Sequence, residues 1–327
     1  MGNYVLGIDG GGTRTRAATV GLDGDVLGVG IGGASNYDDV GVAIAQRNIE
    51  HAVEAATTAA GVARTDCRAV FLGMAGVTSA TDKEHIRDIA LRLKLAPPDR
   101  IGVHHDCRIA LAGGLEGRPG IVQIIGTGSS CYGRTAAGED WLAGGRGHLI
   151  SDEGSGNWMG VHAMRAAVRA YDGRDPATPL LGDVLTALDI TSIEEILHRI
   201  YVVGLSRAEI ATLGPVVVRR AMEGDQAAVQ IVERGAFETA ECVAAVARRL
   251  GMADGPCEVC PVGGMLQAGP TVSERFAAAV VRLLPKATVQ RASLPPALGA
   301  AILALALAGV EVNPAILTRL RANRDRV

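Results

Sequence analysis

The stretch IDGGGTRTR, residues 8–16, is the most informative segment of this chain about its fold. An apolar run ends in Asp9, the glycines 10–12 follow, and Thr13 and Thr15 come just beyond them. Glycines let the backbone turn sharply and approach a ligand closely, and successive amide groups in such a turn form an anion site. A carboxylate beside that site repels a phosphate unless Mg²⁺ lies between them. The stretch therefore predicts half of a magnesium–nucleotide site, and the alternative is a plain hairpin turn.

Length, composition and charge limit the classes of protein that need to be considered. A chain of 327 residues exceeds what one hydrophobic core usually supports, so two domains are expected. Apolar residues make up 48% and charged residues 20%, which is typical of a globular enzyme and excludes a disordered chain. The net charge of −3 argues against nucleic-acid and anionic-membrane partners. No G-x-x-x-x-G-K-[ST] motif occurs, so any phosphate site works without a P-loop lysine.

The sequence also favours a cytoplasmic protein. No basic, apolar and small-residue progression begins the chain, so no signal peptide is expected. The longest apolar run, residues 297–310, is too short and alanine-rich to span a bilayer and predicts a buried helix. Six cysteines in a chain of this length do not form a dense disulfide framework, so a reducing compartment is expected.

Strand and helix patterns alternate along the chain, which indicates the α/β fold class. Residues 42–60 have the three- and four-residue spacing of an amphipathic helix, and 155–171 and 227–250 predict two further helices. Thr81 with Glu84, and Thr271 with Glu274, have the spacing of helix capping boxes. Strands are expected over 4–8, 15–20, 26–30, 69–76, 100–106, 258–265 and 287–291.

The chain contains a degenerate internal duplication. Residues 120–145 repeat the order of the opening segment 4–30: an apolar strand, a glycine turn, a second strand, another turn and a third strand. The glycine turn of the second copy is GTGSS, residues 126–130, and a further turn, VGGM at 262–265, follows another buried strand. Three glycine turns after three strands predict two phosphate sites and a surface for an adenine ring.

In this order, the three turns resemble the phosphate-1, phosphate-2 and adenosine motifs of the sugar kinase, Hsp70 and actin superfamily. Within that superfamily, the chain more closely resembles the N-acetylglucosamine kinase and BadF/BadG/BcrA/BcrD ATPase family. The segments that carry the closer resemblance are GGASN (32–36), HDCRIALAG (105–113), IIGTGSS (124–130) and GGRGHLISDEGSGNWMG (144–160).

This resemblance implies two duplicated ribonuclease-H-like (actin-like ATPase) domains with the nucleotide in the cleft between them. One domain is expected over 1–116 plus 313–327, and the other over 117–312 with a helical insertion at about 175–225. ATP and Mg²⁺ are implied as co-substrate and cofactor, with Asp9 contacting the metal through water. The implied nucleotide-binding residues are Asp9, Gly11, Gly12, Thr13, Thr15, Gly126, Thr127, Gly128, Ser129, Gly263 and Gly264. Related kinases are often dimers, so a homodimer is expected.

Asp106 is the candidate catalytic base. It ends a predicted strand, where a carboxylate can accept the proton of a sugar hydroxyl, and it matches the base of the similar kinases. The alternative is an aspartate that only caps the helix starting at 107. The resemblance implies that the amino sugar is bound by Asn36, Asp106, Gly144, Gly145, Arg146 and Asp152. For Asn36 and Asp152, the alternatives are a turn residue and a helix cap.

Arg146 departs from the family pattern, because the similar kinases typically have tryptophan there. An arginine at this position either turns to solvent or pairs with an anionic substituent of the sugar, such as the lactyl carboxylate of N-acetylmuramate.

The expected function is an ATP-dependent kinase that phosphorylates the 6-hydroxyl of N-acetylglucosamine, glucosamine or a related amino sugar. The rival class is the ATPase that activates a radical dehydratase or reductase through an iron–sulfur cluster. The single C-x-x-C, CEVC at 257–260, lies on a predicted buried strand and is interpreted as two core cysteines. A sugar sensor without catalysis is disfavoured because Asp9 and Asp106 are both present.

Overall fold

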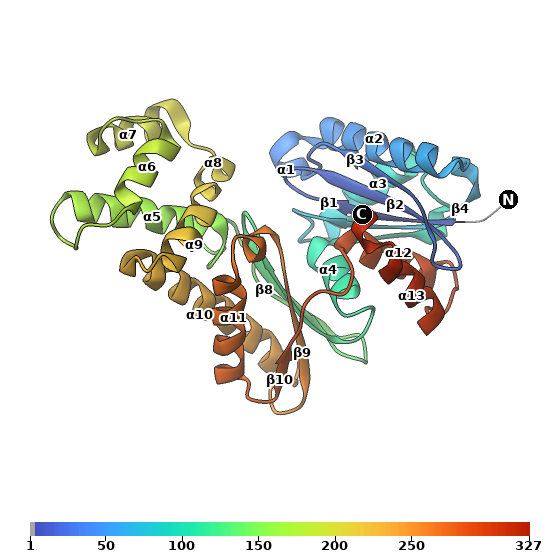
Figure 1. Cartoon of the computed structure of the whole chain (residues 1–327). Helices are drawn as coiled ribbons and strands as arrows, with labels where there is room; N and C mark the ends of the chain where they lie inside the picture. The colour runs from blue at the N-terminus through green and yellow to red at the C-terminus, as the bar shows by residue number, and fades with distance from the viewer. Residues whose placement is uncertain (1–3) are drawn as a thin grey trace. The chain divides into compact units, whose positions relative to one another are not determined.

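The computed structural model describes residues 4–327, which belong to two compact units (Figure 1). Unit 1 comprises Met1–Pro119 and Ala292–Val327, and unit 2 comprises Gly120–Arg291. Each unit contains one five-stranded sheet with helices packed on it, so the predicted α/β class is confirmed. No helix among the described residues is long and apolar enough to span a membrane.

The sheet of unit 1 has the strand order β3-β2-β1-β4-β5. Its strands are β1 (Tyr4–Gly10), β2 (Thr15–Gly21), β3 (Val26–Gly32), β4 (Cys67–Met74) and β5 (Ile101–His105). The first three form an antiparallel meander, and β4 and β5 then run parallel to β1. Gly10, Met74 and His105 are in register, so the carboxyl ends of β1, β4 and β5 meet at one edge of the sheet.

Helices cover both faces of this sheet (Figure 1). They are α1 (Tyr37–Val40), α2 (Val42–Ala60), α3 (Ala80–Arg92), α4 (Asp106–Gly114), α12 (Pro296–Leu307) and α13 (Pro314–Ala322), with 3₁₀ turns η1 (Arg64–Asp66), η2 (Pro98–Arg100) and η6 (Arg324–Arg326). Helix α2 lies so close to β3 that a Cβ on Gly30 would fall 2.0 Å from the Ala52 carbonyl oxygen. Helix α12 approaches β1 in the same way, with Gly7 against the Ala297 carbonyl at 2.3 Å.

The sheet of unit 2 repeats this topology, with the order β8-β7-β6-β9-β10. Its strands are β6 (Gly120–Ile125), β7 (Ser129–Arg134), β8 (Asp140–Gly144), β9 (Cys257–Val262) and β10 (Ala287–Val289). Again a three-stranded antiparallel meander is followed by two parallel strands. The structure therefore confirms the internal duplication.

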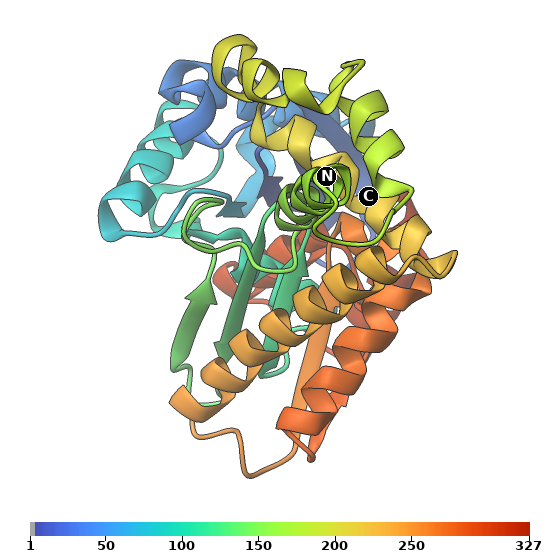
Figure 2. The ribbon, with the colours of Figure 1, turned by 90° about the vertical axis from the view of Figure 1, so that its left-hand side faces the viewer.

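Unit 2 is mostly helical outside its sheet. Helices α10 and α11 pack side by side (Figure 2), and α10 also contacts β7 and β8. The helices are α5 (Gly156–Tyr171), α6 (Leu180–Leu188), α7 (Ile196–His198), α8 (Arg207–Ala211), α9 (Leu213–Met222), α10 (Gln226–Arg249) and α11 (Pro270–Leu283), with η3 (Ile193–Glu195), η5 (Gly264–Gln267) and the π-helical turn η4 (Arg199–Gly204). The predicted helical segment 175–225 accordingly contains α6 to α9.

The structure corrects three details of the sequence analysis. Residues 292–312, expected in the second domain, belong to unit 1, because α12 packs on α4, β1 and β4. The capping box of α3 is formed by Ser79 and Asp82, two residues before the predicted pair. Helix α11 begins with Pro270 and has no side-chain cap, so the predicted cap at Thr271 is wrong.

Candidate active site

The first glycine turn connects β1 to β2 and is held from inside unit 1. The Gly11 N–H donates to the Arg14 carbonyl at 2.9 Å, and the Ser35 N–H donates to the Gly11 carbonyl at 3.0 Å. A Cβ on Gly10 would fall 2.6 Å from Ser35 Oγ, so the strand end tolerates no side chain. Gly12 and Thr13 are exposed at the tip. A fixed turn with an exposed glycine–threonine tip suits an anion.

Thr15 occupies a different position from Thr13. It pairs with Gly10 in the strand register and is fully buried. Its hydroxyl donates to the Gly33 carbonyl at 2.7 Å and lies 2.7 Å from Ser35 Oγ. Of the two threonines expected at the phosphates, the structure places only Thr13 at the surface of the turn.

Asp9 and Asp106 bring two carboxylates to the same edge of the first sheet. Asp9 lies at the carboxyl end of β1, and Asp106 begins α4 directly after β5. Burial raises the pKa of Asp9 to about 7, the Asp106 carboxylate adds to this rise, and Arg16 and Arg14 oppose it. Carboxylate oxygens are the ligands that Mg²⁺ prefers. The two carboxylates are half-buried, and the charge of Asp106 raises the pKa of Asp9, so the pair fits a divalent cation.

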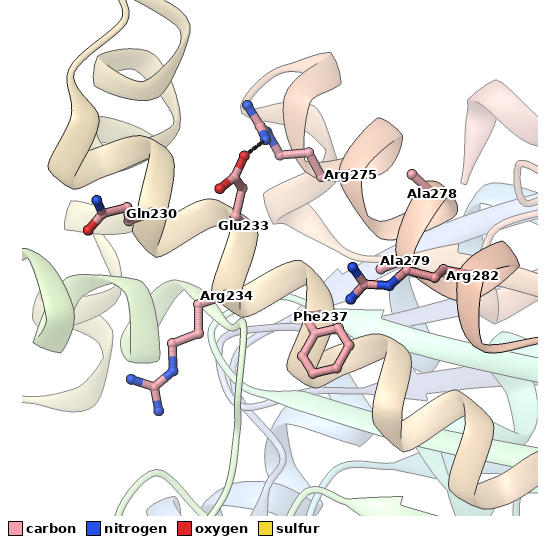
Figure 3. A pocket seen from close by; sticks show the side chains of 8 residues that line it. All are labelled: Gln230, Glu233, Arg234, Phe237, Arg275, Ala278, Ala279 and Arg282. Carbon is pink, nitrogen blue, oxygen red and sulfur yellow. Dashed lines mark hydrogen bonds and ion pairs between the residues drawn. The ribbon is translucent and has the colours of Figure 1, made fainter.

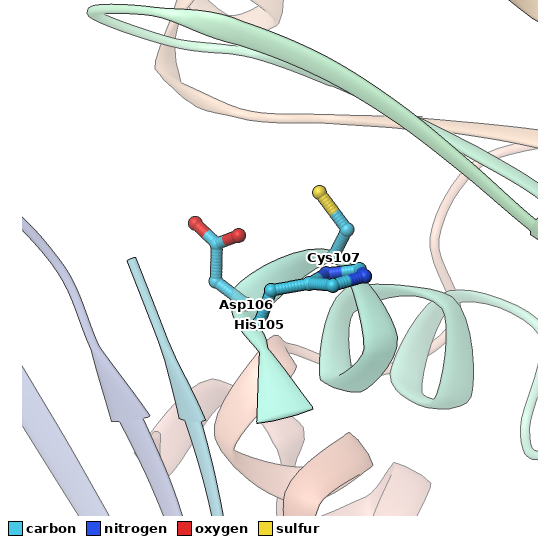
Figure 4. A group of neighbouring side chains, drawn as sticks. All are labelled: His105, Asp106 and Cys107. Carbon is cyan, nitrogen blue, oxygen red and sulfur yellow. The ribbon is translucent and has the colours of Figure 1, made fainter. Parts of the chain in front are cut away.

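The Asp106 carboxylate is also hydrogen-bonded at the start of α4. Burial raises its pKa, while the Cys107 thiol and the backbone N–H groups of Asp106 and Cys107 donate to the carboxylate and oppose the rise. The ligand atoms of His105, Asp106 and Cys107 lie within 4.8 Å of one another (Figure 4). Structural zinc sites have four ligands, and these three are consecutive. We therefore interpret the cluster as the surroundings of the candidate base, Asp106, rather than a metal centre.

Asn36 lies at the amino end of α1 in unit 1. Its side-chain oxygen accepts from the Asp38 N–H, and its amide donates to Asp39 Oδ2 at 2.7 Å. A Cβ on Gly76, which has a φ of +85°, would fall 2.3 Å from Asn36 Oδ1, so this glycine makes room for the amide. Asn36 is thus a helix cap, and its partly exposed side chain is still able to contact a ligand.

The second glycine turn connects β6 to β7 in unit 2 and is anchored on α5. The Gly126 N–H donates to the Gly128 carbonyl at 2.9 Å, and the N–H groups of Gly156 and Asn157 donate to the carbonyls of Gly126 and Thr127. Thr127 is exposed at the tip, as Thr13 is in the first turn. Ser129 is buried, and its hydroxyl donates to the Glu153 carbonyl at 2.7 Å.

The third glycine turn lies beside the second. Strand β9 runs parallel to β6, and the two strands end at the same edge of the sheet. Gly263 has a φ of +120° and rests on Ile125, where a Cβ would fall 2.3 Å from the carbonyl oxygen. Gly264 is exposed, with open space at its Cβ position. The backbone at Gly263 and Gly264 is therefore accessible to a flat ligand.

The loop from Gly144 to Asp152 contains the remaining predicted sugar residues. Gly144 and Gly145 have φ angles of +68° and +65°, which favour glycine. Arg146 is exposed and has no ion-pair partner among residues 4–327. Asp152, in contrast, is only 3% exposed, accepts from the Ser129 N–H at 3.3 Å, and pairs with Arg207 at 2.8 Å.

A surface pocket of about 630 Å³ lies elsewhere in unit 2, between α10 and α11 (Figure 3). Its lining residues are Gln230, Glu233, Arg234, Phe237, Arg275, Ala278, Ala279 and Arg282. An ion pair between Arg275 and Glu233 crosses it, and the Arg282 guanidinium stacks over the Phe237 ring. No residue of the predicted site lines this pocket, so it is not the candidate active site.

Comparison with known proteins identifies the family. The model of the BadF/BadG/BcrA/BcrD ATPase family matches residues 6–304. The chain belongs to this family. The resemblance inferred from the glycine turns and the 144–160 segment is therefore confirmed.

Relatives of this ATPase family member include two curated kinases. The N-acetylmuramic acid/N-acetylglucosamine kinase of Clostridium acetobutylicum is 35% identical over 301 residues, covering 92% of this chain and 98% of the relative. The N-acetyl-D-glucosamine kinase of Dictyostelium discoideum is 28% identical over 310 residues, covering 92% and 97%. Among solved structures, a candidate N-acetylglucosamine kinase from Chromobacterium violaceum is 28% identical with a TM-score of 0.73, covering 93% of this chain and 99% of that one.

The cysteines of CEVC do not resemble cluster ligands in this chain. Cys257 is 4% exposed and Cys260 is fully buried, both on β9. Burial raises the pKa of Cys257 to about 11 and that of Cys260 to about 12. Metal and cluster binding requires thiolates, so the structure supports the interpretation of both as core residues.

Sequence reasoning missed Arg207, the ion-pair partner of Asp152. The two residues are 55 positions apart, and Arg207 lies in the helical segment that no motif explains. The only local signal is Ser206 with Glu209, a capping box that marks the start of α8. Such a signal predicts a helix start but not the direction of the arginine beside it.

Proposed function

We propose that this chain is an ATP-dependent amino-sugar kinase, which transfers the γ-phosphoryl group of MgATP to the 6-hydroxyl of N-acetylglucosamine, glucosamine or a related amino sugar. The observation that carries the proposal is the pair Asp9 and Asp106 at the carboxyl ends of β1 and β5, beside an exposed glycine turn. The two kinases named above, which match nearly their whole length, support it.

In the proposed mechanism, Asp106 accepts the proton of the 6-hydroxyl. A general base acts best when its pKa lies near the working pH, and burial raises the pKa of Asp106 toward that range. The Cys107 thiol and the N–H groups at the start of α4 stabilise the carboxylate and fix its direction. The residue thus combines basicity with orientation.

Nucleotide binding is assigned to the glycine turns. The tips at Gly12–Thr13 and Thr127–Gly128 donate to phosphate oxygens, and Gly263–Gly264 offer a surface to the adenine. Asp9 would hold Mg²⁺ through water, and the ion would supply positive charge for the phosphates. The proposal includes a homodimer, which is carried over from the related kinases. It also includes a cytoplasmic location, which the free thiols support.

Asn36, Gly144, Gly145, Arg146 and Asp152 are proposed to bind the amino sugar. Asp152 accepts from sugar hydroxyls, and the exposed Arg146 pairs with an anionic substituent. The Clostridium relative is named for both N-acetylmuramic acid and N-acetylglucosamine. We therefore include N-acetylmuramate among the substrates.

The test is ADP release from MgATP with glucosamine, N-acetylglucosamine, N-acetylmannosamine, N-acetylmuramate and glucose. We expect strong stimulation by at least one amino sugar and a loss of about 10²–10⁴-fold in Asp106→Ala. Asp99→Ala, which removes a carboxylate on η2, is the matched control and should retain full activity. Slow ADP release that no sugar changes would contradict the proposal and favour the partner-activating ATPase.

A further inference from the structure

The segment 175–225, to which the sequence assigns no role, contributes one side chain to the candidate sugar site. Arg207 begins α8 in this segment, and its Nη2 donates to Asp152 Oδ2 at 2.8 Å. The Asp152 side chain is 4% exposed and that of Arg207 is 39% exposed. Within the described part of the chain, Arg207 forms its ion pair with Asp152. Arg207 Nε is buried and has no hydrogen-bond partner among those residues.

The second glycine turn makes room for this ion pair. A Cβ on Gly128 would fall 2.0 Å from Arg207 Nη2 and 2.9 Å from Asp152 Oδ2. The other carboxylate oxygen, Asp152 Oδ1, accepts from the Ser129 N–H of the same turn at 3.3 Å. The turn expected at a phosphate, the aspartate expected at the sugar, and Arg207 therefore form one contiguous cluster in unit 2.

The backbone of Arg207 is fixed by close packing of α8 on α5. Asn157 Nδ2 donates to the Arg207 carbonyl at 3.1 Å, and a Cβ on Gly160 would fall 2.2 Å from the Ile210 carbonyl oxygen. Ser206 and Glu209 close a capping box around the first turn of α8. The guanidinium thus extends from an anchored position.

Asp152 needs such a partner. Its φ of +64° is uncommon for a residue other than glycine, so surrounding contacts must hold it. Burial raises its pKa and Glu153 adds to the rise, whereas Arg207, the Ser129 N–H and His148 oppose it, with Arg207 the strongest of the three. A buried carboxylate without a partner becomes protonated rather than remaining charged.

We propose that Arg207 is the positioning residue of the amino-sugar site, which holds Asp152 ionised and directed to accept hydrogen bonds from sugar hydroxyls. Through this residue, the segment 175–225 becomes part of the site that determines sugar affinity. The inference rests on the proposed kinase function.

The experiment compares Arg207→Ala, Arg207→Lys and the wild type by steady-state kinetics over pH. In Arg207→Ala we expect the KM for the sugar to rise at least tenfold, with kcat and the KM for ATP changed less than about threefold. The acid limb of kcat/KM for the sugar should move to higher pH, because Asp152 loses its cation. Arg207→Lys should restore the acid limb, since it retains the charge. Arg219→Ala, an exposed arginine on α9, is the control and should match the wild type.

A double-mutant cycle separates action through Asp152 from a general loss of structure. In an Asp152→Asn background, Arg207→Ala should change the KM for the sugar less than twofold. An unchanged pH profile and sugar KM in Arg207→Ala, with an active wild type, would overturn the inference, as would full additivity in the cycle. If Arg207→Ala does not fold, the pH profile of Arg207→Lys is the test instead. An acid limb of its kcat/KM for the sugar that lies at higher pH than in the wild type would then overturn the inference. A wild type that phosphorylates no sugar would instead contradict the proposed function itself.

Discussion

Asp9→Asn is expected to make the folded protein more stable at neutral pH while removing the MgATP-dependent activity proposed above. The pKa of Asp9 is 3.8 as an ordinary aspartate and about 7 in the folded protein. The folded state therefore binds the proton more tightly than the unfolded chain, and ionisation of Asp9 opposes folding. This penalty is negligible below about pH 3, grows as the pH rises through about 7, and is nearly constant above about pH 8.

The size of the effect follows from the difference between the two pKa values. About three pKa units at 1.36 kcal/mol each give a penalty of about 4 kcal/mol at pH 8, about 3 kcal/mol at pH 6 and under about 1 kcal/mol at pH 4. Because asparagine carries no charge, Asp9→Asn should recover this free energy of unfolding with the same pH dependence. Asp99→Asn changes an exposed aspartate of unit 1 and should stay within about 0.5 kcal/mol of the wild type.

The measurement must report on unit 1. Both tryptophans, Trp141 and Trp158, lie in unit 2, so tryptophan fluorescence follows the wrong unit. Native-state hydrogen exchange of the β1 and β4 amides, in EDTA at pH 6 and pH 8, reports the free energy of opening of unit 1 directly. A loss of stability in Asp9→Asn, or a gain that does not change with pH, would show that ionisation of Asp9 does not oppose folding.

Three further predictions concern packing, specificity and thiol reactivity. Gly30→Ala should destabilise unit 1 by about 1–3 kcal/mol in urea unfolding, because its Cβ meets the Ala52 carbonyl, whereas Gly182→Ala on α6 meets open space and should be neutral or stabilising. Equal losses in both would count against the close α2–β3 packing. Arg146→Ala should lower the ratio of kcat/KM for N-acetylmuramate to kcat/KM for N-acetylglucosamine about tenfold, because the variant loses the cation that pairs with the carboxylate. The control variant Arg174→Ala should leave this ratio unchanged. An unaltered ratio in Arg146→Ala would mean that Arg146 only faces solvent. Cys260 should react with a disulfide reagent only on unfolding at pH 8, because burial raises its pKa to about 12, and rapid labelling of the native protein would contradict this.

The fold could be predicted from the sequence because its decisive signals are local. Each glycine turn follows directly on the strand that positions it, and the strand patterns of 4–30 and 120–145 repeat in the same order. The placement of α12 could not be predicted in this way. That helix is apolar nearly all round, so its pattern indicates burial but not which sheet it covers.

Details of the site depend on contacts that a pattern does not encode. Thr13 and Thr15 are the same residue type in the same motif, and the sequence does not distinguish them. The pairing of Thr15 with Gly10 in the strand register shows that the second threonine lies inside unit 1. Ser79 with Asp82 and Thr81 with Glu84 both have capping-box spacing. In the structure the first pair forms the capping box, and Asp82 also accepts from the Tyr37 hydroxyl.

Detection of the phosphorylated product tests the proposed kinase activity most directly. Wild-type protein and Asp106→Asn are incubated with MgATP and each amino sugar, and ³¹P and ¹H NMR determine which hydroxyl carries the phosphate. We expect a 6-phosphate of at least one amino sugar with the wild type, and a rate lower by about 10²–10⁴-fold with Asp106→Asn. Transfer to another hydroxyl, an undiminished rate in Asp106→Asn, or ATP hydrolysis without any phosphorylated sugar would contradict it.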